Sequence, residues 1–226
     1  MIKTKEEIEK LKKVCVLTDK GFKFICQNIK PGMTEIEIAK KLDDYMFSLG
    51  ASALAFDTIV GSGINSSLMH STPSDRKIEK QDIIQFDIGY VFDGYCSDMS
   101  RMVFVGGITE KQKDIYNLVL KTQMNAITNI RVGMLANEAD FLGRKFILDE
   151  GLDYNHSLGH GIGKKVHEEL IISPKRETLL EENMVFTIEP GVYLENEFGI
   201  RIEDTVLLTQ NGIVTLTNST KEIIII

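Results

Sequence analysis

The sequence predicts an α+β protein made of two similar halves. Two helical patterns are followed by β-strand patterns, and this order then begins again. The segment Ile29-Lys30-Pro31-Gly32-Met33 is echoed later in the chain by Ile130-Arg131-Val132-Gly133-Met134. An internal repeat of this kind indicates two halves, about 1–105 and 106–226, related by a pseudo-twofold axis with their sheets joined around a shared centre.

Three capping boxes mark the starts of the predicted helices. In each, a threonine is followed three residues later by Glu or Gln, and the two side chains satisfy free N–H groups of the first turn. The pairs are Thr4/Glu7, Thr34/Glu37 and Thr109/Gln112. Apolar residues recur at spacings of three and four from Ile8 to Ile29, so the first helix buries one long stripe. Pro31-Gly32, Gly50 and Gly133 supply the predicted helix ends.

The β-rich region of the first half is organised by one hairpin signal. Asp93-Gly94 favours a two-residue turn, because both residues tolerate the positive φ angles that such a turn requires. It joins strands predicted over 83–92 and 95–105. A further strand is expected over 56–60, with a turn over 61–63.

Composition and charge exclude several kinds of partner. The 226 residues carry a net charge of −7 with lysines scattered among acids, so we expect neither nucleic acid nor a membrane surface as a partner. No segment approaches the ~20 apolar residues of a membrane span, and the charged start Met1–Glu7 is not a secretory signal. Three cysteines without close pairing are typical of reduced thiols, namely Cys15, Cys26 and Cys96. We therefore expect one cytoplasmic domain over residues 1–226.

Three of the four histidines fall within one glycine-rich stretch, residues 155–168. They are His156, His160 and His167. Imidazole is a common metal ligand and a proton carrier near neutral pH, so this clustering favours a chemical role. The alternative is a surface loop whose histidines are close by chance.

Two aspartates lie close together in the predicted hairpin. With a two-residue turn at 93–94, Asp98 lies opposite Gly89 and Asp87 lies opposite Ser100, which makes the two carboxylates diagonal neighbours on one face. Carboxylates this close repel each other unless a cation lies between them. We expect the missing side chain of Gly89 to leave room for that cation. The alternative is a solvated polar face.

Two glutamates lie in later β-patterned runs, Glu189 in 185–193 and Glu203 in 199–206. A surface ion pair between Arg201 and Glu203 is the alternative reading of the second run. Together with Asp87, Asp98 and His160, however, the glutamates make an oxygen-rich ligand set that suits Mn, Co, Zn or Fe(II). Four carboxylates balance two divalent ions, which can activate a bridging water, so the natural reaction class is hydrolysis.

With these residues, the chain resembles the pita-bread metallopeptidases (M24), which include methionine aminopeptidase, aminopeptidase P and prolidase. The resemblance covers essentially the whole chain. The order Asp, Asp, His, Glu, Glu matches the family's dinuclear site, as Asp87, Asp98, His160, Glu189 and Glu203. It implies a pita-bread fold, in which two pseudo-twofold-related α+β halves surround a curved central antiparallel sheet.

The histidines are similar to those of the aminopeptidase P and prolidase branch. That branch carries a histidine four residues before the metal-binding one, another seven after it, and one seventeen before the first aspartate, as His156, His167 and His70 do here. Methionine aminopeptidases share the residues around 159–163 and His167-Glu168 but generally lack the position of His156. His156 therefore favours the first branch.

The resemblance also implies a role for each ligand. Asp87 and Asp98 would hold one ion. Asp98, His160 and Glu189 would hold the other, with Glu203 bridging the two. Glu189 would in addition accept and donate the proton of the attacking water.

The remaining site residues are implied to act on the substrate or on the ligands. His70 and His167 would contact the substrate and stabilise the tetrahedral intermediate, and His156 would line the pocket for the residue after the scissile bond. Arg201 and Tyr193 would orient the ligating carboxylates. A structural histidine stays open for His70, and ordinary core packing stays open for Tyr193.

These residues predict a metallo-exopeptidase that removes the first residue from small peptides with proline second, through a hydroxide that bridges two divalent ions. Mn is the favoured metal, with Co, Zn or Fe as alternatives. The first alternative function is a methionine aminopeptidase, and the next is a non-catalytic peptide- or protein-binding member of the fold. The family's habits favour a homodimer over a monomer.

The chain departs from the resembled enzymes in three places. Aminopeptidase P and prolidase usually carry a separate N-terminal domain, which we expect to be absent here. Glu169-Leu170 follows His167-Glu168 where relatives often have a proline, and Lys164-Lys165 replaces a more apolar pair. None of these departures removes a predicted ligand.

Overall fold

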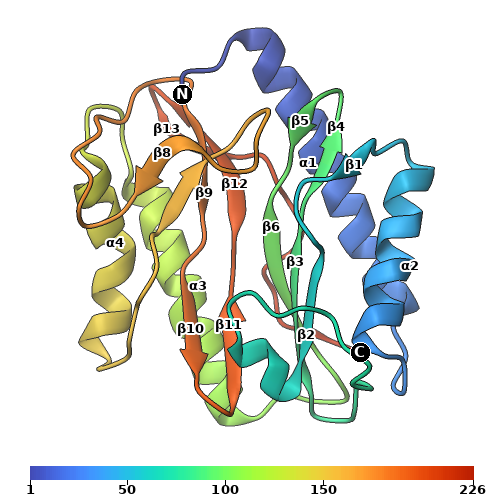
Figure 1. The fold of residues 1–226 in the computed structure, drawn as a ribbon. Coiled ribbons are helices and arrows are strands. Elements are labelled where there is room, and N and C mark those ends of the chain that lie inside the picture. The colour runs from blue at the N-terminus through green and yellow to red at the C-terminus, as the bar shows by residue number, and fades with distance from the viewer.

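Two helix pairs flank the strands in the computed structural model, which describes residues 1–226 (Figure 1). The first pair lies on one side of the molecule and the second pair lies on the other, with the strands between them. The helices are α1 (Lys5–Asn28), α2 (Glu35–Ser48), α3 (Glu110–Asn129) and α4 (Ala136–Asp149). None of them combines the length and the apolar composition that a membrane crossing requires.

The predicted capping boxes form at the start of three helices. Thr4 caps α1, Thr34 caps α2 and Thr109 caps α3, each with the residue three positions later. The repeat extends to α4, but Leu135 stands where the first half has Thr34. Only half of the box remains there, in which the carboxylate of Glu138 accepts the Leu135 N–H at 2.8 Å.

The first half builds a four-stranded sheet and a small three-stranded one. The larger sheet has the order β14-β6-β3-β2, and its strands are β2 (Ile59–Ser62), β3 (Ile83–Ile88), β6 (Met99–Phe104) and β14 (Ile224–Ile225). A short 3-10 helix, η1 (Gly63–Ser67), follows β2. The smaller sheet contains β1 (Ala53–Leu54), β4 (Tyr90–Phe92) and β5 (Tyr95–Cys96).

The second half builds a five-stranded sheet and a separate two-stranded ribbon. The five strands have the order β13-β12-β9-β7-β8, with bounds β7 (Gly159–Gly161), β8 (Glu168–Ile172), β9 (Val185–Ile188), β12 (Asp204–Thr209) and β13 (Gly212–Thr215). The ribbon pairs β10 (Gly191–Leu194) with β11 (Phe198–Arg201). The expected central sheet is thus divided between the halves, and its pairs are antiparallel except for β14 with β6.

The hairpin prediction is confirmed in its turn and its register. Asp93 and Gly94 have φ angles of 51° and 78°, and Asp87 pairs with Ser100 as expected. The prediction of two unbroken strands is wrong, because each strand is interrupted near residues 89 and 97–98. These breaks separate the β4–β5 tip from the longer β3–β6 pair.

Two further boundaries differ from the sequence prediction. The strand expected over 56–60 begins only at Ile59 and continues through Ser62, so the turn expected over 61–63 is displaced. Gly61 and Ser62 instead pair with Gln85 and Ile84 of β3. The division into halves near residue 106 is also not strict, because β14, from the end of the chain, pairs with β6 of the first-half sheet.

Each half has its own apolar core between its helices and its sheet. The first cluster joins α1 and α2 to the strands through residues such as Phe22, Leu42 and Phe86. The second joins α3 and α4 to the five-stranded sheet through residues such as Ala126 and Phe186. All three cysteines are free, and Cys15 and Cys96 are buried. Two further clusters combine residues of both halves and pack the halves against each other.

Candidate metal centre

One pocket of about 410 Å³ brings together every site residue that the sequence analysis named. Seventeen residues line it, among them His70, Asp87, Asp98, His156, His160, His167, Glu189, Tyr193, Arg201 and Glu203. The first half contributes the aspartates, and the second half contributes the glutamates and His160. The pocket therefore lies where the two halves face each other.

Three of the predicted ligands lie in short gaps between two consecutive strands. Asp98 lies between β5 and β6, Glu189 between β9 and β10, and Glu203 between β11 and β12. Asp87 lies within β3, and His160 lies in β7 where a register irregularity separates it from Gly161. A break in a ladder re-aims a side chain that regular alternation would direct elsewhere. The breaks thus coincide with the side chains that converge.

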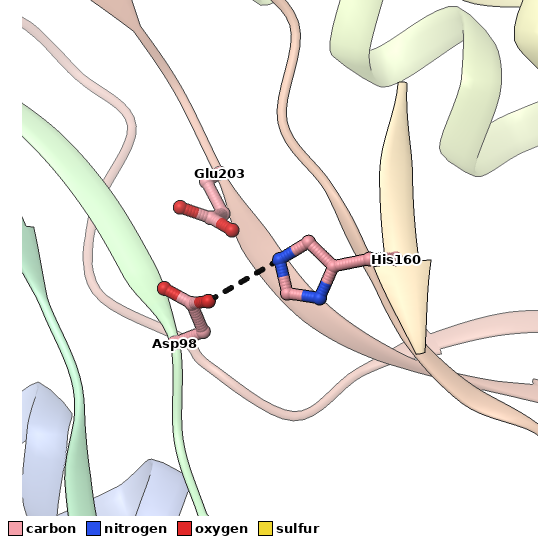
Figure 2. A group of neighbouring side chains, drawn as sticks. All are labelled: Asp98, His160 and Glu203. Atoms are coloured by element: carbon pink, nitrogen blue, oxygen red, sulfur yellow. Dashed lines mark ion pairs between the residues drawn. The ribbon is translucent and has the colours of Figure 1, made fainter. Parts of the chain in front are cut away.

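The carboxylates converge on the imidazole of His160. Its Nε2 lies 3.5 Å from Asp98 Oδ2 and 3.4 Å from Glu189 Oε1. Figure 2 shows Asp98, His160 and Glu203 reaching toward one another from three separate segments. One ligand atom from each of these three residues lies within 4.8 Å of the other two, a spacing compatible with a shared cation.

The donor set fits divalent cations on three observations. Asp87 Oδ1 and Glu203 Oε1 are buried and have no hydrogen-bond partner, although buried carboxylate oxygens are normally paired. Burial raises the pKa of Asp98 and of Glu203 well above the ordinary values, and neighbouring carboxylates raise both further. Burial also raises the pKa of Glu189. A positive charge between these groups would relieve both the repulsion and the missing contacts.

Arg201 lines the pocket and forms an ion pair with one of the four carboxylates, Asp87. It is 2% exposed, and its guanidinium donates to Asp87 Oδ2 at 2.5 Å. It also donates to Ser100 Oγ at 2.7 Å and to the Tyr193 hydroxyl at 2.5 Å. The alternative of a surface ion pair between Arg201 and Glu203 is wrong. One arginine cannot neutralise four carboxylates, so most of the negative charge is unbalanced by protein groups.

The space beside Gly89 does not serve a cation, so that expectation is wrong. A Cβ atom at Gly89 would lie 2.3 Å from the ring of Phe56 and 2.5 Å from the carbonyl oxygen of Ser97. The glycine is needed because an aromatic side chain and the opposite backbone occupy this place. Phe56 itself lines the pocket.

The other three histidines surround this carboxylate cluster. The ring of His167 lies 4.3 Å from that of His160, measured between centroids. The ring of His156 lies 4.6 Å from that of Tyr154 and 5.9 Å from that of Tyr193, measured between centroids, and burial lowers the pKa of His156 to about 4. Burial also lowers the pKa of His167. His70 is exposed at the pocket rim.

Several residues that contact the site carry no signal in the sequence. Ser100 donates to Glu203 Oε2 at 2.8 Å, and Thr187 donates to Glu189 Oε1 at 3.0 Å. Arg101 is 1% exposed and donates to the carbonyl oxygen of Glu203 at 2.5 Å. The predicted register placed Ser100 opposite Asp87. Serine and threonine are nevertheless too common in strands to indicate a contact with a metal-ligating carboxylate.

Similarity to known sequences agrees with this geometry. Residues 9–210 match the family described as Peptidase_M24, "Metallopeptidase family M24". A protein of Pyrococcus furiosus named Xaa-Pro dipeptidase is 44% identical over 226 residues, which is 99% of this chain and 65% of that protein. The chain thus spans about 65% of the length of this relative.

Solved structures with the same fold cover the whole chain. An X-Pro aminopeptidase from Thermotoga maritima superposes with a TM-score of 0.97 at 41% identity, covering 100% of this chain and 65% of that one. A Xaa-Pro dipeptidase from Bacillus anthracis gives 0.98 at 40% identity, covering 100% and 64%. These matches confirm the α+β pita-bread fold. By sequence and by fold, the chain belongs to metallopeptidase family M24.

Proposed function

We propose that residues 1–226 form one catalytic domain of a metal-dependent exopeptidase, which hydrolyses the bond between an N-terminal residue and a following proline. One observation carries this proposal. The five predicted ligands converge in one pocket, and two of their buried oxygens, Asp87 Oδ1 and Glu203 Oε1, have no protein partner. The names of the relatives, Xaa-Pro dipeptidase and X-Pro aminopeptidase, support the substrate class.

Two divalent ions fit the charge of this ligand set. We assign Asp87 and Asp98 to one ion, and Asp98, His160 and Glu189 to the other, with Glu203 shared between them. When bound, such a pair of ions supplies an acidified water as nucleophile and polarises the scissile carbonyl. Mn is the metal we expect, because hard carboxylate ligands with a single imidazole suit it.

Glu189 is our candidate for proton transfer. Its Oε1 accepts the hydroxyl hydrogen of Thr187 at 3.0 Å, and its side chain is 17% exposed at the pocket wall. A carboxylate within hydrogen-bond reach of a reacting water can both accept and donate its proton. The same group would take the proton of the attacking water and return it to the leaving amine.

The remaining residues would bind the substrate or orient the ligands. His70 and His167 at the rim would contact the peptide and stabilise the tetrahedral intermediate. His156 would line the wall for the proline ring, since its buried imidazole is held neutral near pH 7. Arg201 donates to Asp87 and to the Tyr193 hydroxyl, and such contacts would orient the ligating carboxylate and tune its basicity.

Proline gives a chemical reason for a dedicated site. The Xaa-Pro bond has no N–H to donate and restricts the residue before it to extended conformations. A peptidase that binds its substrate through that N–H would therefore fail on this bond.

We expect small peptides to be the substrates, and we expect the protein to be a cytoplasmic homodimer.

The test is the release of the first residue from Ala-Pro, Ala-Pro-Gly and Met-Gly-Gly by Mn-loaded protein, with a chelated sample alongside. Metal-dependent cleavage of a proline peptide, with Met-Gly-Gly spared, is the expected result. Cleavage of Met-Gly-Gly alone would instead indicate a methionine aminopeptidase. A protein that cleaves nothing, retains no divalent ion and gains no thermal stability from Mn would be a binding module.

A further inference from the structure

A buried ion pair on α4 holds the loop that carries His156. Arg144 donates to Asp140 through two nitrogens, at 2.5 and 2.8 Å. The same guanidinium donates to two loop carbonyls, Tyr154 O at 2.5 Å and His156 O at 2.7 Å. Asp140 also accepts the Leu158 N–H at 3.2 Å. The pair thus contacts the backbone on both sides of His156.

The contact between α4 and this loop is close and well shielded from water. Asp140 is 1% exposed, and the side chain of Arg144 is 15% exposed. The guanidinium carbon of Arg144 lies 4.3 Å from the centroid of the Tyr154 ring. A Cβ atom at Gly143 would come within 2.5 Å of Leu158, so the helix leaves no free space beneath the loop. Charge-assisted hydrogen bonds in such a setting are strong.

The loop in turn sets the direction of the imidazole. His156 Nδ1 lies 2.8 Å from the carbonyl oxygen of Ser157. The imidazole also packs against Tyr154 and against Tyr193, a pocket residue, at centroid distances of 4.6 and 5.9 Å. The second nitrogen, Nε2, is buried and has no protein partner. Such an unpaired buried nitrogen is unusual, because buried polar atoms are normally hydrogen-bonded.

We propose that Arg144 and Asp140 are positioning residues that aim His156 into the substrate pocket. The inference rests on the proposed function, because it takes His156 to contact the residue after the scissile bond. Helix stability alone would need only the pairing of Arg144 with Asp140. The donation of its other hydrogens to the 154 and 156 carbonyls ties that pair to the loop.

The experiment compares Arg144→Met and Arg144→Lys with Lys145→Met, a matched control on the neighbouring exposed position of α4. Each variant is also made in a His156→Ala background. KM and kcat for Ala-Pro are measured on the metal-loaded protein. The ring-proton resonances of His156 are recorded by NMR at fixed pH on the Zn-loaded protein, where the two tyrosine rings shift them.

We expect Arg144→Met to raise KM about tenfold, the effect of losing charged hydrogen bonds, with little change in kcat. Arg144→Lys keeps the charge beside Asp140 and recovers part of this loss. In the His156→Ala background Arg144→Met should have almost no further effect on KM. The His156 resonances should move toward those of an unstacked histidine in Arg144→Met and stay unchanged in Lys145→Met.

An equal rise of KM in both backgrounds would overturn the proposal, because the arginine would then act independently of His156. Unchanged His156 resonances in Arg144→Met would overturn it as well. If the unmodified protein cleaves no proline peptide, the proposed function fails, and the NMR comparison alone decides whether the pair positions the imidazole.

Discussion

Two buried glutamates should respond in opposite ways to the loss of their charge. Glu203 is 1% exposed, and its Oε1 has no hydrogen-bond partner. Glu35 is 0% exposed, but both of its oxygens accept hydrogen bonds, from Ser62, Asn65 and Ser74. In metal-free protein, Glu203→Gln should therefore raise the free energy of unfolding, and Glu35→Gln should lower it.

The contacts set the magnitude of each change. Glu203→Gln replaces a charge that lies against other carboxylates with an amide that can donate to them, so we expect a gain of about 1–3 kcal/mol, the cost of one unsatisfied buried group. In Glu35→Gln, the new NH₂ group faces the N–H and O–H donors of either Ser62 or Ser74. The hydrogen bonds from those donors to a charged oxygen are lost, at about 1.5–3 kcal/mol each. Each kcal/mol moves Tm by roughly 2–4 °C in a chain of this size.

The assay is thermal unfolding followed by circular dichroism, first with chelator and then with excess Mn²⁺. The unmodified protein should gain Tm with Mn²⁺, because an ion that binds only the folded state stabilises it. The rise in Tm on addition of Mn²⁺ should be much smaller in Glu203→Gln, and in Glu35→Gln it should equal that of the unmodified protein. If Glu203→Gln lowers the metal-free Tm as far as Glu35→Gln does, the unpaired oxygen is not a source of instability and the reasoning is refuted.

Three further changes test other parts of the structure. Asp204→Asn removes the carboxylate that pairs with the buried Arg101 at 2.6 Å, and we expect a loss of about 3–5 kcal/mol in urea unfolding; a loss below about 1 kcal/mol would contradict this. Gly159→Ala places a Cβ atom 1.9 Å from the backbone oxygen of Thr187, so the variant should not yield folded protein, and a native circular dichroism spectrum would disprove the clash. Burial raises the folded-state pKa of Asp43 above its unfolded value, so its carboxylate opposes folding once the pH rises through that folded-state pKa. Asp43→Asn keeps the oxygen that accepts both hydroxyl bonds, and its Tm relative to the unmodified protein should rise between pH 4 and pH 7, whereas a constant difference would show that the charge is harmless.

The helices could be predicted from the sequence because their signals are local. The box of Thr4 with Glu7 and the apolar spacing behind it need no distant contact to form, and α1 begins where they predict. The hairpin register also followed from two turn residues. The strand breaks at 89 and 97–98 have no local signal, and the ring that packs against Gly89 comes from Phe56, far from it in the sequence.

The candidate site was predictable only in part, for a similar reason. Carboxylates and histidines are conspicuous by type, and the ten named residues all line one pocket. Glu35 and Glu203 nevertheless look alike in the sequence, and only the structure separates the glutamate surrounded by donors from the one that is not. Arg144 gave no signal either, since a helix carrying Asp and Arg four residues apart is ordinary.

The pairing of β14 with β6 has a consequence for the order in which the chain folds during synthesis. Residues 224–225 leave the ribosome long after β6, yet they complete the edge of its sheet. An N-terminal half commonly folds first as it emerges, but here its edge strand stays open until the last β-strand arrives. An unpaired strand edge invites association with other chains. The nascent protein should therefore depend on chaperones until β14 has paired with β6.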